Sequence, residues 1–287
     1  MFSRRLARIC AAAVVVMSVC SVIGAVPAGA LPQPVTNLSY APGPYETLSV
    51  FPAAMPGARL VVMVHGGGWL SYLDNYGNTP AAATDLQAAG FTVVVVNYAP
   101  ATLSFAGTPL QVQTAEVTLA TQWALANATL YNGDPNHLTL VGLSAGGDLV
   151  ATVSQMLPPG TVKAVVTLSG AFDFTSLLPD GLLGLTPLSL AYRASQALGC
   201  QLSTCPRSTE VTWSPDRHVT PTNCPGTWLL FNSENELMPL DQPASMTVAL
   251  AADGCNVEES IVPGTGHAYD YWNGVVQQVI STIQARG

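Results

Sequence analysis

The sequence predicts a three-layer α/β/α fold around one mostly parallel sheet, and two observations lead to this prediction. Short apolar runs rich in Val and Leu, without alternating polar residues, are typical of strands buried on both faces of a parallel sheet. Helical stretches separate these runs, and right-handed crossovers then place helices on both faces of the sheet. The expected strands are Arg59–Val64, Phe91–Val96, His137–Gly142, Val162–Leu168 and Thr227–Phe231, followed by the strand-like VEESIVPG at Val257–Gly264.

Four stretches between or after these strands predict helices. The longest begins at Thr108 and Pro109, which supply a cap and a first turn, and ends at Gly133. We expect its buried face to carry Val112, Ala115, Leu119, Trp123, Ala126 and Leu130. The other helices are expected over Ala145–Leu157, Asp241–Ala252 and Asn273–Gln284. Sheets of this kind bind ligands at the carboxyl ends of their strands, so a functional site is expected there.

Residues 1–30 have the composition of a secretory signal peptide. Three arginines precede an apolar run from Ile9 to Val26, and the small residues of AGA at Ala28–Ala30 suit cleavage. A transmembrane anchor is the alternative, but the run is marginal for the roughly 20 residues that a membrane span needs. We therefore expect a secreted protein whose single domain covers residues 31–287, with no stable membrane span after cleavage.

The charge of the remaining chain is sparse and negative. Without the arginines of the first thirty residues, six Lys and Arg face seventeen Asp and Glu. No basic patch is available to neutralise phosphates, which argues against nucleic acid as a partner. No H-E-x-x-H pattern and no dinucleotide-binding fingerprint occur, so neither a metal nor an organic cofactor is expected. The oligomeric state is left open.

Four cysteines remain after the signal peptide: Cys200, Cys205, Cys224 and Cys255. An even number in an oxidising compartment predicts two disulfides rather than a zinc site. Three pairings are possible, and we favour Cys200 with Cys205 and Cys224 with Cys255. Three of these cysteines lie in Thr175–Cys224, a long segment that interrupts the alternation of strands and helices. We interpret residues 175–224 as a cap-like insertion over the site, with plain surface packing as the alternative.

The stretch GLSAGG places Ser144 in a sharp turn between a strand and a helix. Such a turn strains the serine backbone and crowds its neighbours, so Gly142 and Gly146 must lack side chains. The exposed hydroxyl then lies above a helix amino terminus, which suits a nucleophile. An ordinary glycine-rich connection is the alternative for this motif taken alone.

Two further motifs carry groups that a nucleophilic serine needs. HGGG at His65–Gly68 follows an earlier strand, and the amides of Gly67 and Gly68, together with that of Ala145, can hold an oxyanion. GTGHAY places His267 after the last strand, where the general base belongs in a Ser, acid, His chain order. Three aromatic residues near the glycines are candidates to line a pocket, with core packing as the alternative for the first: Trp69, Tyr72 and Tyr76.

These motifs, with NYAP at Asn97–Pro100 and WSPDRHVT at Trp213–Thr220, resemble those of the α/β-hydrolase superfamily. The resemblance is to the hormone-sensitive-lipase-like carboxylesterases and the bacterial feruloyl-esterase-like (BD-FAE) branch, and it extends over nearly all of Pro44–Ile283. It implies a serine hydrolase that cleaves a small-molecule or lipid-like carboxylic ester without a cofactor. By this resemblance, the nucleophile, the base and the oxyanion donors are Ser144, His267, and Gly67, Gly68 and Ala145.

One position departs from the pattern of these families. They usually place the triad acid in the loop after the strand predicted at Thr227–Phe231, four residues before a proline, and Asn235 occupies that position. Asparagine neither holds the imidazole in the needed tautomer nor balances its charge. We expect Glu236 to supply the carboxylate instead, with Glu234 and Asp173 as the other candidates. If the acid is absent, a non-catalytic binding protein is the alternative function. An acyltransferase, which would use the same triad, is another alternative.

Overall fold

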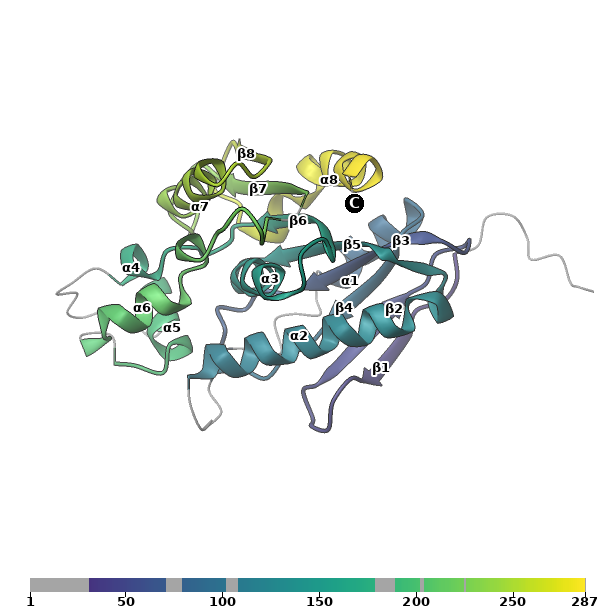
Figure 1. The fold of residues 1–287 in the computed structure, drawn as a ribbon, viewed down its shortest axis with the longest axis horizontal. Coiled ribbons are helices and arrows are strands. Elements are labelled where there is room, and N and C mark those ends of the chain that lie inside the picture. Colours follow the sequence, from purple (N-terminus) through teal and green to yellow (C-terminus); the bar gives the residue numbers. More distant parts are fainter. Residues whose placement is uncertain are drawn as a thin grey trace, which may run out of the picture. The chain divides into compact units, whose positions relative to one another are not determined.

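The computed structural model describes residues 31–70, 79–101, 108–178, 189–201, 204–224 and 226–286. The expected signal peptide, residues 1–30, lies outside the described residues, as do Tyr72 and Tyr76. The described chain forms one eight-stranded sheet in the order β1-β2-β4-β3-β5-β6-β7-β8, with helices on both faces (Figure 1). The three-layer α/β/α fold predicted from the sequence is confirmed.

Six consecutive neighbours in this sheet are parallel, and they correspond to the five apolar runs of the sequence and the strand-like stretch that follows them. Their bounds are β3 Ala58–Val64, β4 Thr92–Val96, β5 Gly133–Leu143, β6 Val162–Leu168, β7 Thr227–Ser233 and β8 Val257–Val262. Two antiparallel strands, β1 Val35–Ser39 and β2 Thr47–Phe51, extend one edge and were not predicted. β1 is largely exposed and carries no apolar run, so the sequence gives little sign of it.

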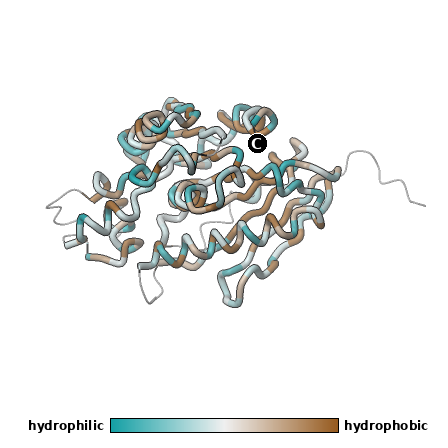
Figure 2. Tube along the Cα trace, viewed as in Figure 1, coloured by the Kyte–Doolittle hydropathy of each residue, from teal (hydrophilic) through white to brown (hydrophobic). Residues whose placement is uncertain are grey.

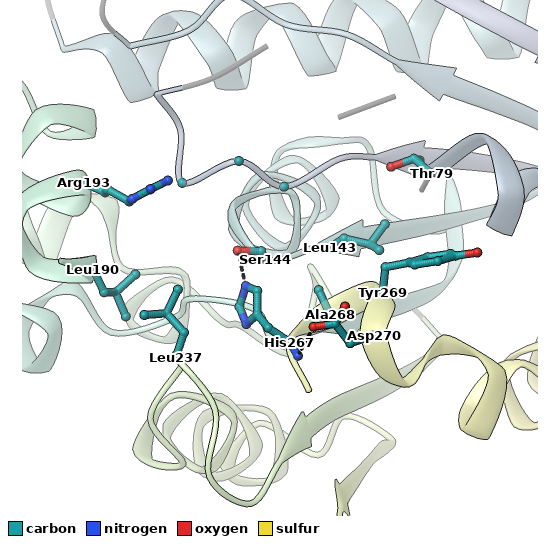
Figure 3. Close-up of a pocket in the computed structure, with 13 residues that line it drawn as sticks. Thr79, Leu143, Ser144, Leu190, Arg193, Leu237, His267, Ala268, Tyr269 and Asp270 are labelled. Atoms are coloured by element: carbon teal, nitrogen blue, oxygen red, sulfur yellow. Dashed lines mark hydrogen bonds between the residues drawn. The ribbon is translucent and has the colours of Figure 1, made fainter. Parts of the chain in front are cut away.

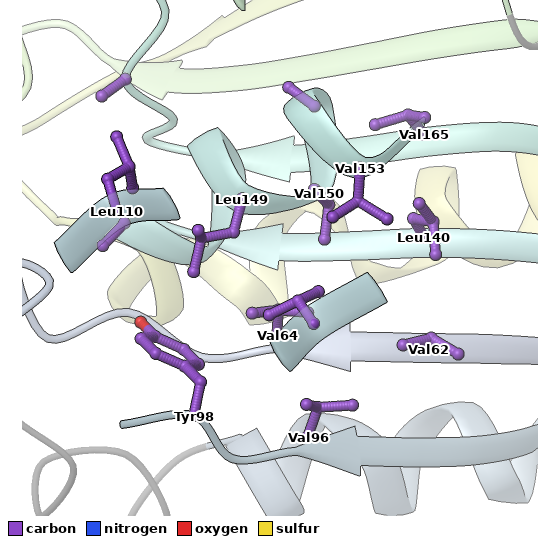
Figure 4. Packing of buried hydrophobic residues seen from close by; sticks show 14 of the residues in the cluster. Val62, Val64, Val96, Tyr98, Leu110, Leu140, Leu149, Val150, Val153 and Val165 are labelled. Carbon is purple, nitrogen blue, oxygen red and sulfur yellow. The ribbon is translucent and has the colours of Figure 1, made fainter. Parts of the chain in front are cut away.

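Two hydrophobic clusters lie on the two faces of the sheet. Helices α2 Pro109–Asn127, α3 Ala145–Met156 and α7 Asp241–Ala252 bury side chains in one cluster. Helices α1 Thr79–Ala88 and α8 Trp272–Arg286 bury theirs in the other. The strands are the most hydrophobic part of the trace in Figure 2. Figure 4 shows strand side chains packed against those of α3: Val62, Val64 and Leu140 come from the strands, and Leu149, Val150 and Val153 from the helix.

The predicted buried face of α2 is wrong. Leu119 is 47% exposed, and Leu130, which belongs to the following 3₁₀ turn η1 Ala128–Tyr131, is 74% exposed. The helix instead buries Gln113, Glu116, Val117, Ala120, Thr121 and Ala124. Two of the polar residues on this face bond to the loop after β4: Gln113 Nε2 donates to the carbonyl of Ala99, and Glu116 accepts from the Ala99 amide, at 2.8 and 2.7 Å. Long-range hydrogen bonds of this kind override apolar periodicity.

In its described residues, the insertion between β6 and β7 forms the short helices α4 Phe174–Leu177, α5 Leu190–Ala197 and α6 Arg207–Trp213, and the 3₁₀ turn η3 Pro215–Arg217. The favoured disulfide pairing is confirmed. Cys200–Cys205 closes the segment directly after α5, and Cys224–Cys255 ties the end of the insertion to the residues before β8. Among the described residues, no helix has the length and apolar character needed to cross a membrane.

Candidate active site

Ser144 lies in a strained turn between β5 and α3. Its φ is 53°, in the left-handed region that non-glycine residues rarely adopt, and its amide donates to Leu168 of the neighbouring strand at 2.8 Å. The flanking glycines are needed because a Cβ on Gly142 would lie 2.3 Å from the Gly146 carbonyl oxygen, and one on Gly146 2.2 Å from that of Val64. The crowding expected from the GLSAGG stretch is therefore present.

His267 follows β8 and lies beside this turn. Its Nε2 is 2.9 Å from Ser144 Oγ (Figure 3). Its Nδ1 contacts a carboxylate oxygen of Glu236. The backbone amide of His267 donates to Asp270 at 3.0 Å, which fixes the start of the turn η4 Ala268–Tyr271. The imidazole thus bridges a hydroxyl and a carboxylate, the arrangement that proton transfer from the serine requires.

The Glu236 side chain is fully buried and accepts hydrogen bonds from three groups. One oxygen accepts from the Ser233 amide at 2.7 Å and from Ser169 Oγ at 2.8 Å, and the other contacts His267 Nδ1. An ionised carboxylate has only acceptors, so three donors around it suit that state. Glu236 can therefore hold one tautomer of the imidazole and balance a positive charge on it.

Ser169, which was not singled out from the sequence, connects several parts of this arrangement. It is the first residue after β6, has a φ of 55°, and accepts from the Ala268 amide at 2.8 Å while donating to Glu236. The Tyr271 hydroxyl lies 2.7 Å from its Oγ and donates to the Phe231 carbonyl at 3.1 Å. Burial raises the pKa of Tyr271, so the phenol stays protonated. The only sign of Ser169 in the sequence is its place at the end of a strand next to β5.

The other two candidates for the acid, Asp173 and Glu234, are engaged elsewhere, and so is Asn235. Asp173 caps α4 and pairs with Arg217 at 2.9 Å, so its carboxylate is engaged in the insertion. Glu234 is exposed and accepts from the Gly264 amide at 3.3 Å, and Asn235 is exposed and donates through its backbone to the same residue. Of the three candidates, the fold brings Glu236 alone to His267, because the turn after β7 directs its side chain back under the strand ends.

The glycines after β3 pass directly beside the serine. Gly67 and Gly68 have φ values of 113° and 59°, and a Cβ on Gly66 would lie 2.9 Å from Ser144 Cβ. In the part of the chain that the structure describes, neither the Gly67 nor the Gly68 amide donates a hydrogen bond within the protein. Ala145 begins α3 directly after Ser144. These amides are open to bind an anion.

Trp69 packs in the core, so the interpretation of this residue as pocket lining is wrong and its alternative is right. The side chain is fully buried, and its Nε1 donates to Asp148 in the first turn of α3 at 2.9 Å. Its φ of 60° is positive, and its carbonyl accepts from Gln113 at 2.8 Å. Desolvation raises the pKa of Asp148 to about 8. These contacts join the glycine loop to α2 and α3.

His65 is a structural residue at the start of the glycine loop. Its Nδ1 lies 2.7 Å from the Gly66 carbonyl, and its ring stacks on that of Tyr98 with centroids 4.3 Å apart. Burial lowers the pKa of His65 to about 4, so the ring is neutral at ordinary pH. The Tyr98 hydroxyl donates to the His65 carbonyl at 3.0 Å. The ring therefore supports the loop without carrying charge.

A cavity of about 250 Å³ opens over Ser144 and His267. Besides the three glycines, Leu190, Leu237, Arg193, Thr79 and Asp270 contribute to its walls (Figure 3). In the described ranges, no cluster of three or more His, Cys, Asp or Glu is arranged to hold a metal ion. The combination of an activated hydroxyl, open amides and a small cavity suits attack on a carbonyl carbon.

Curated proteins similar to this chain include a named hydrolase and named esterases. The phenmedipham hydrolase of Pseudarthrobacter oxydans is 36% identical over 104 residues, which is 34% of this chain and 20% of that protein. The esterase LipC of Mycobacterium tuberculosis is 27% identical over 235 residues, which is 76% of this chain and 54% of that protein. This chain thus spans between about a fifth and about a half of the length of these relatives.

Solved structures share the fold over most of the chain. A truncated carbohydrate esterase from gut microbiota matches with a TM-score of 0.72 at 18% identity, over 89% of this chain and 96% of that one. Esterase B from Lactobacillus rhamnosis matches with a TM-score of 0.70 at 17% identity, over 88% and 85%. The BD-FAE family matches residues 51–250, more than half of the sequence. The fold is that of the α/β hydrolases, and the chain belongs to the BD-FAE family.

Proposed function

We propose that this protein is an exported serine esterase that hydrolyses small carboxylic esters. The observation that carries the proposal is the continuous hydrogen-bonded chain from Glu236 through His267 to Ser144, beside the open amides of Gly67 and Gly68. The names of similar proteins support it, since they include an esterase and a carboxylesterase. The cavity volume favours a small ester over a bulky one.

The proposed reaction has two steps. His267 takes the proton of Ser144 as its Oγ attacks the acyl carbon, and the amides of Gly67, Gly68 and Ala145 stabilise the oxyanion. The tetrahedral intermediate collapses, the ester bond breaks, and His267 gives the proton to the leaving alcohol. Water, deprotonated by His267, then attacks the acyl-enzyme and releases the acid and the free serine. Glu236 keeps the imidazole oriented and offsets its positive charge throughout.

Export and a cap complete the proposal. Residues 1–30 serve as a signal peptide, and the two disulfides of the described chain favour an oxidising compartment. The insertion at residues 175–224 acts as a cap, because Leu190 and Arg193 of α5 stand in the wall of the cavity. On that side of the cavity, the substrate would therefore contact residues of the insertion and not residues of the sheet.

Hydrolysis of p-nitrophenyl acetate, butyrate and octanoate by the purified protein tests the proposal. We expect activity that falls by about 10⁴-fold or more in Ser144→Ala, while Ser281→Ala, on the exposed face of α8, serves as the matched control. The profile over the three acyl chains measures the length that the cavity accepts. Rates in folded wild-type protein no higher than those of Ser144→Ala would contradict the proposal and favour a binding protein.

A further inference from the structure

Helix α5 presents two different faces, one to the core and one to the cavity. Ala191, Ala194 and Ala197 are buried at 8% exposure or less. Leu190 and Arg193, three positions apart and therefore on one side of the helix, line the cavity instead. The disulfide Cys200–Cys205 follows the helix directly and restrains its end. The fold thus holds a positively charged side chain at a fixed place in the cavity wall.

Arg193 lies across the glycine loop. A Cβ on Gly68 would be 2.6 Å from Arg193 Cδ and 2.7 Å from its Nη1, so the absence of a side chain at position 68 makes room for the guanidinium. Figure 3 shows Arg193 reaching toward the glycine backbone from the side of the cavity where Leu190 and Leu237 lie. The cation is therefore close to the position of the scissile ester in the proposed reaction.

Among the described residues, the guanidinium of Arg193 has donors without a partner. Its Nε is buried and makes no hydrogen bond, and no carboxylate of the described residues lies within 4.0 Å of it, whereas Arg207 and Arg217 both form ion pairs. Buried charged donors are normally satisfied, so an unpaired one at a cavity wall points to a ligand. Asp270, also in the wall, is already bonded to the His267 amide. The sequence as a whole has a net charge of −8, which repels anions. A local cation in the cavity wall would therefore be needed to attract an anionic ligand.

We propose that Arg193 binds a carboxylate carried by the substrate, so that the preferred esters are half-esters of dicarboxylic acids or esters whose alcohol bears a carboxylate. This inference rests on the proposed esterase function. The planar guanidinium matches a carboxylate with two parallel hydrogen bonds, and such charged pairs are strong in a partly desolvated site. Leu190 and Leu237 pack along the carbon chain between the two polar ends.

Two pairs of matched substrates test the inference and separate the two sources of the carboxylate. Mono-p-nitrophenyl adipate against p-nitrophenyl hexanoate places the charge on the acyl side, and 4-acetoxybenzoate against 4-acetoxybenzamide places it on the alcohol side. For at least one pair, we expect Arg193→Gln to lower the ratio of kcat/KM for the charged over the neutral ester by about 10- to 100-fold. Arg193→Lys is expected to lose less.

A surface arginine provides the control for net charge. Arg286 is exposed at the end of α8, and Arg286→Gln removes the same charge without changing the cavity, so the ratio should stay within about 2-fold of the wild type. An unchanged ratio in Arg193→Gln for both pairs would overturn the inference. Equal losses for charged and neutral esters would also overturn it, because they would assign Arg193 to the oxyanion or to the fold.

A binding measurement separates this inference from the proposed function. Monoethyl adipate is titrated calorimetrically into Ser144→Ala and into Ser144→Ala/Arg193→Gln. Binding that weakens about 10-fold or more without Arg193 supports the carboxylate site even if no ester is hydrolysed. If neutral esters are hydrolysed but binding and rates do not depend on Arg193, the esterase proposal stands and the inference fails.

Discussion

Two buried carboxylates lie at the carboxyl end of the sheet in contrasting surroundings. Glu236 receives hydrogen bonds from a backbone amide, a serine hydroxyl and an imidazole. Asp148 accepts from Trp69 Nε1 at 2.9 Å, with Thr152 Oγ1 at 3.5 Å as its only other side-chain neighbour of this kind among the described residues. Desolvation raises the pKa of Asp148 to about 8, so it is largely protonated at neutral pH. The donors around a buried acid, more than its depth, decide whether it works as an anion.

The two acids also support different halves of the site. Glu236 orients the histidine, whereas Asp148 holds Trp69 and through it the loop that carries Gly67 and Gly68. The first contribution depends on a charge that the proposed reaction needs. The second depends only on an acceptor atom in the right place. Substitutions that keep shape but remove charge should therefore separate them.

Glu236→Gln is the change with the largest expected effect. The amide removes the negative charge beside His267 and admits the wrong tautomer, so kcat should fall by about 10⁴-fold, the size seen for the corresponding change in a serine protease. The rates of p-nitrophenyl butyrate hydrolysis measure this effect. Glu234→Gln, an exposed neighbour, is the control and should stay within about 2-fold. A similar fall in kcat for both variants would contradict a specific role of Glu236 beside His267.

Ser169→Ala should have a smaller effect on the same step. It removes the donor to Glu236 and the acceptor for the Ala268 amide, while it leaves the triad side chains present. A displacement of the imidazole costs on the order of 10- to 100-fold in kcat. Saturation kinetics measure kcat and KM separately, and we expect KM to change little. A change confined to KM would assign Ser169 to substrate binding instead of positioning.

Asp148 should respond to loss of shape but not to loss of charge. Asp148→Leu leaves the buried Trp69 Nε1 without an acceptor and should lower the free energy of unfolding by about 2 kcal/mol. Asp148→Asn keeps an acceptor oxygen and should cost less than about 1 kcal/mol. Urea unfolding of both variants measures the difference. An equal loss in the free energy of unfolding for Asp148→Asn and Asp148→Leu would contradict this, because it would mean that the charge of Asp148 contributes to stability.

The pH dependence of stability sharpens the same point. The folded state holds the Asp148 proton up to about pH 8, whereas an unfolded aspartate releases it near pH 4. The folded state therefore binds more protons between these values, and stability falls as pH rises through this window. From pH 6 to pH 8 the wild type should lose about 2 kcal/mol more than Asp148→Asn does, which thermal melting at the two pH values detects. Parallel pH profiles for both proteins would contradict a protonated Asp148.

Local sequence patterns predicted the parallel strands and the motif residues. The features that they did not predict depend on contacts between residues distant in the sequence. Apolar runs were sufficient for β3 to β7, and a strand-like pattern indicated β8. The motifs singled out Ser144 and His267, which the structure places 2.9 Å apart. The buried face of α2 could not be read from periodicity, because Gln113 and Glu116 are held by the loop at Ala99. The places of Ser169 and Arg193 in the site were not predicted for the same reason, because their neighbours come from other strands and from the insertion.

Four non-glycine residues with positive φ gather at the strand ends around the site: Trp69, Ser144, Ser169 and Ala268. Each conformation of this kind costs roughly 1–3 kcal/mol, and small domains have only about 5–15 kcal/mol of net stability. These four backbone conformations around the site therefore reduce the free energy of unfolding by an amount comparable to a large part of its net value. Selection for thermal stability alone would favour substitutions that remove these positive φ angles. Variants obtained in this way should be more stable but have a lower kcat.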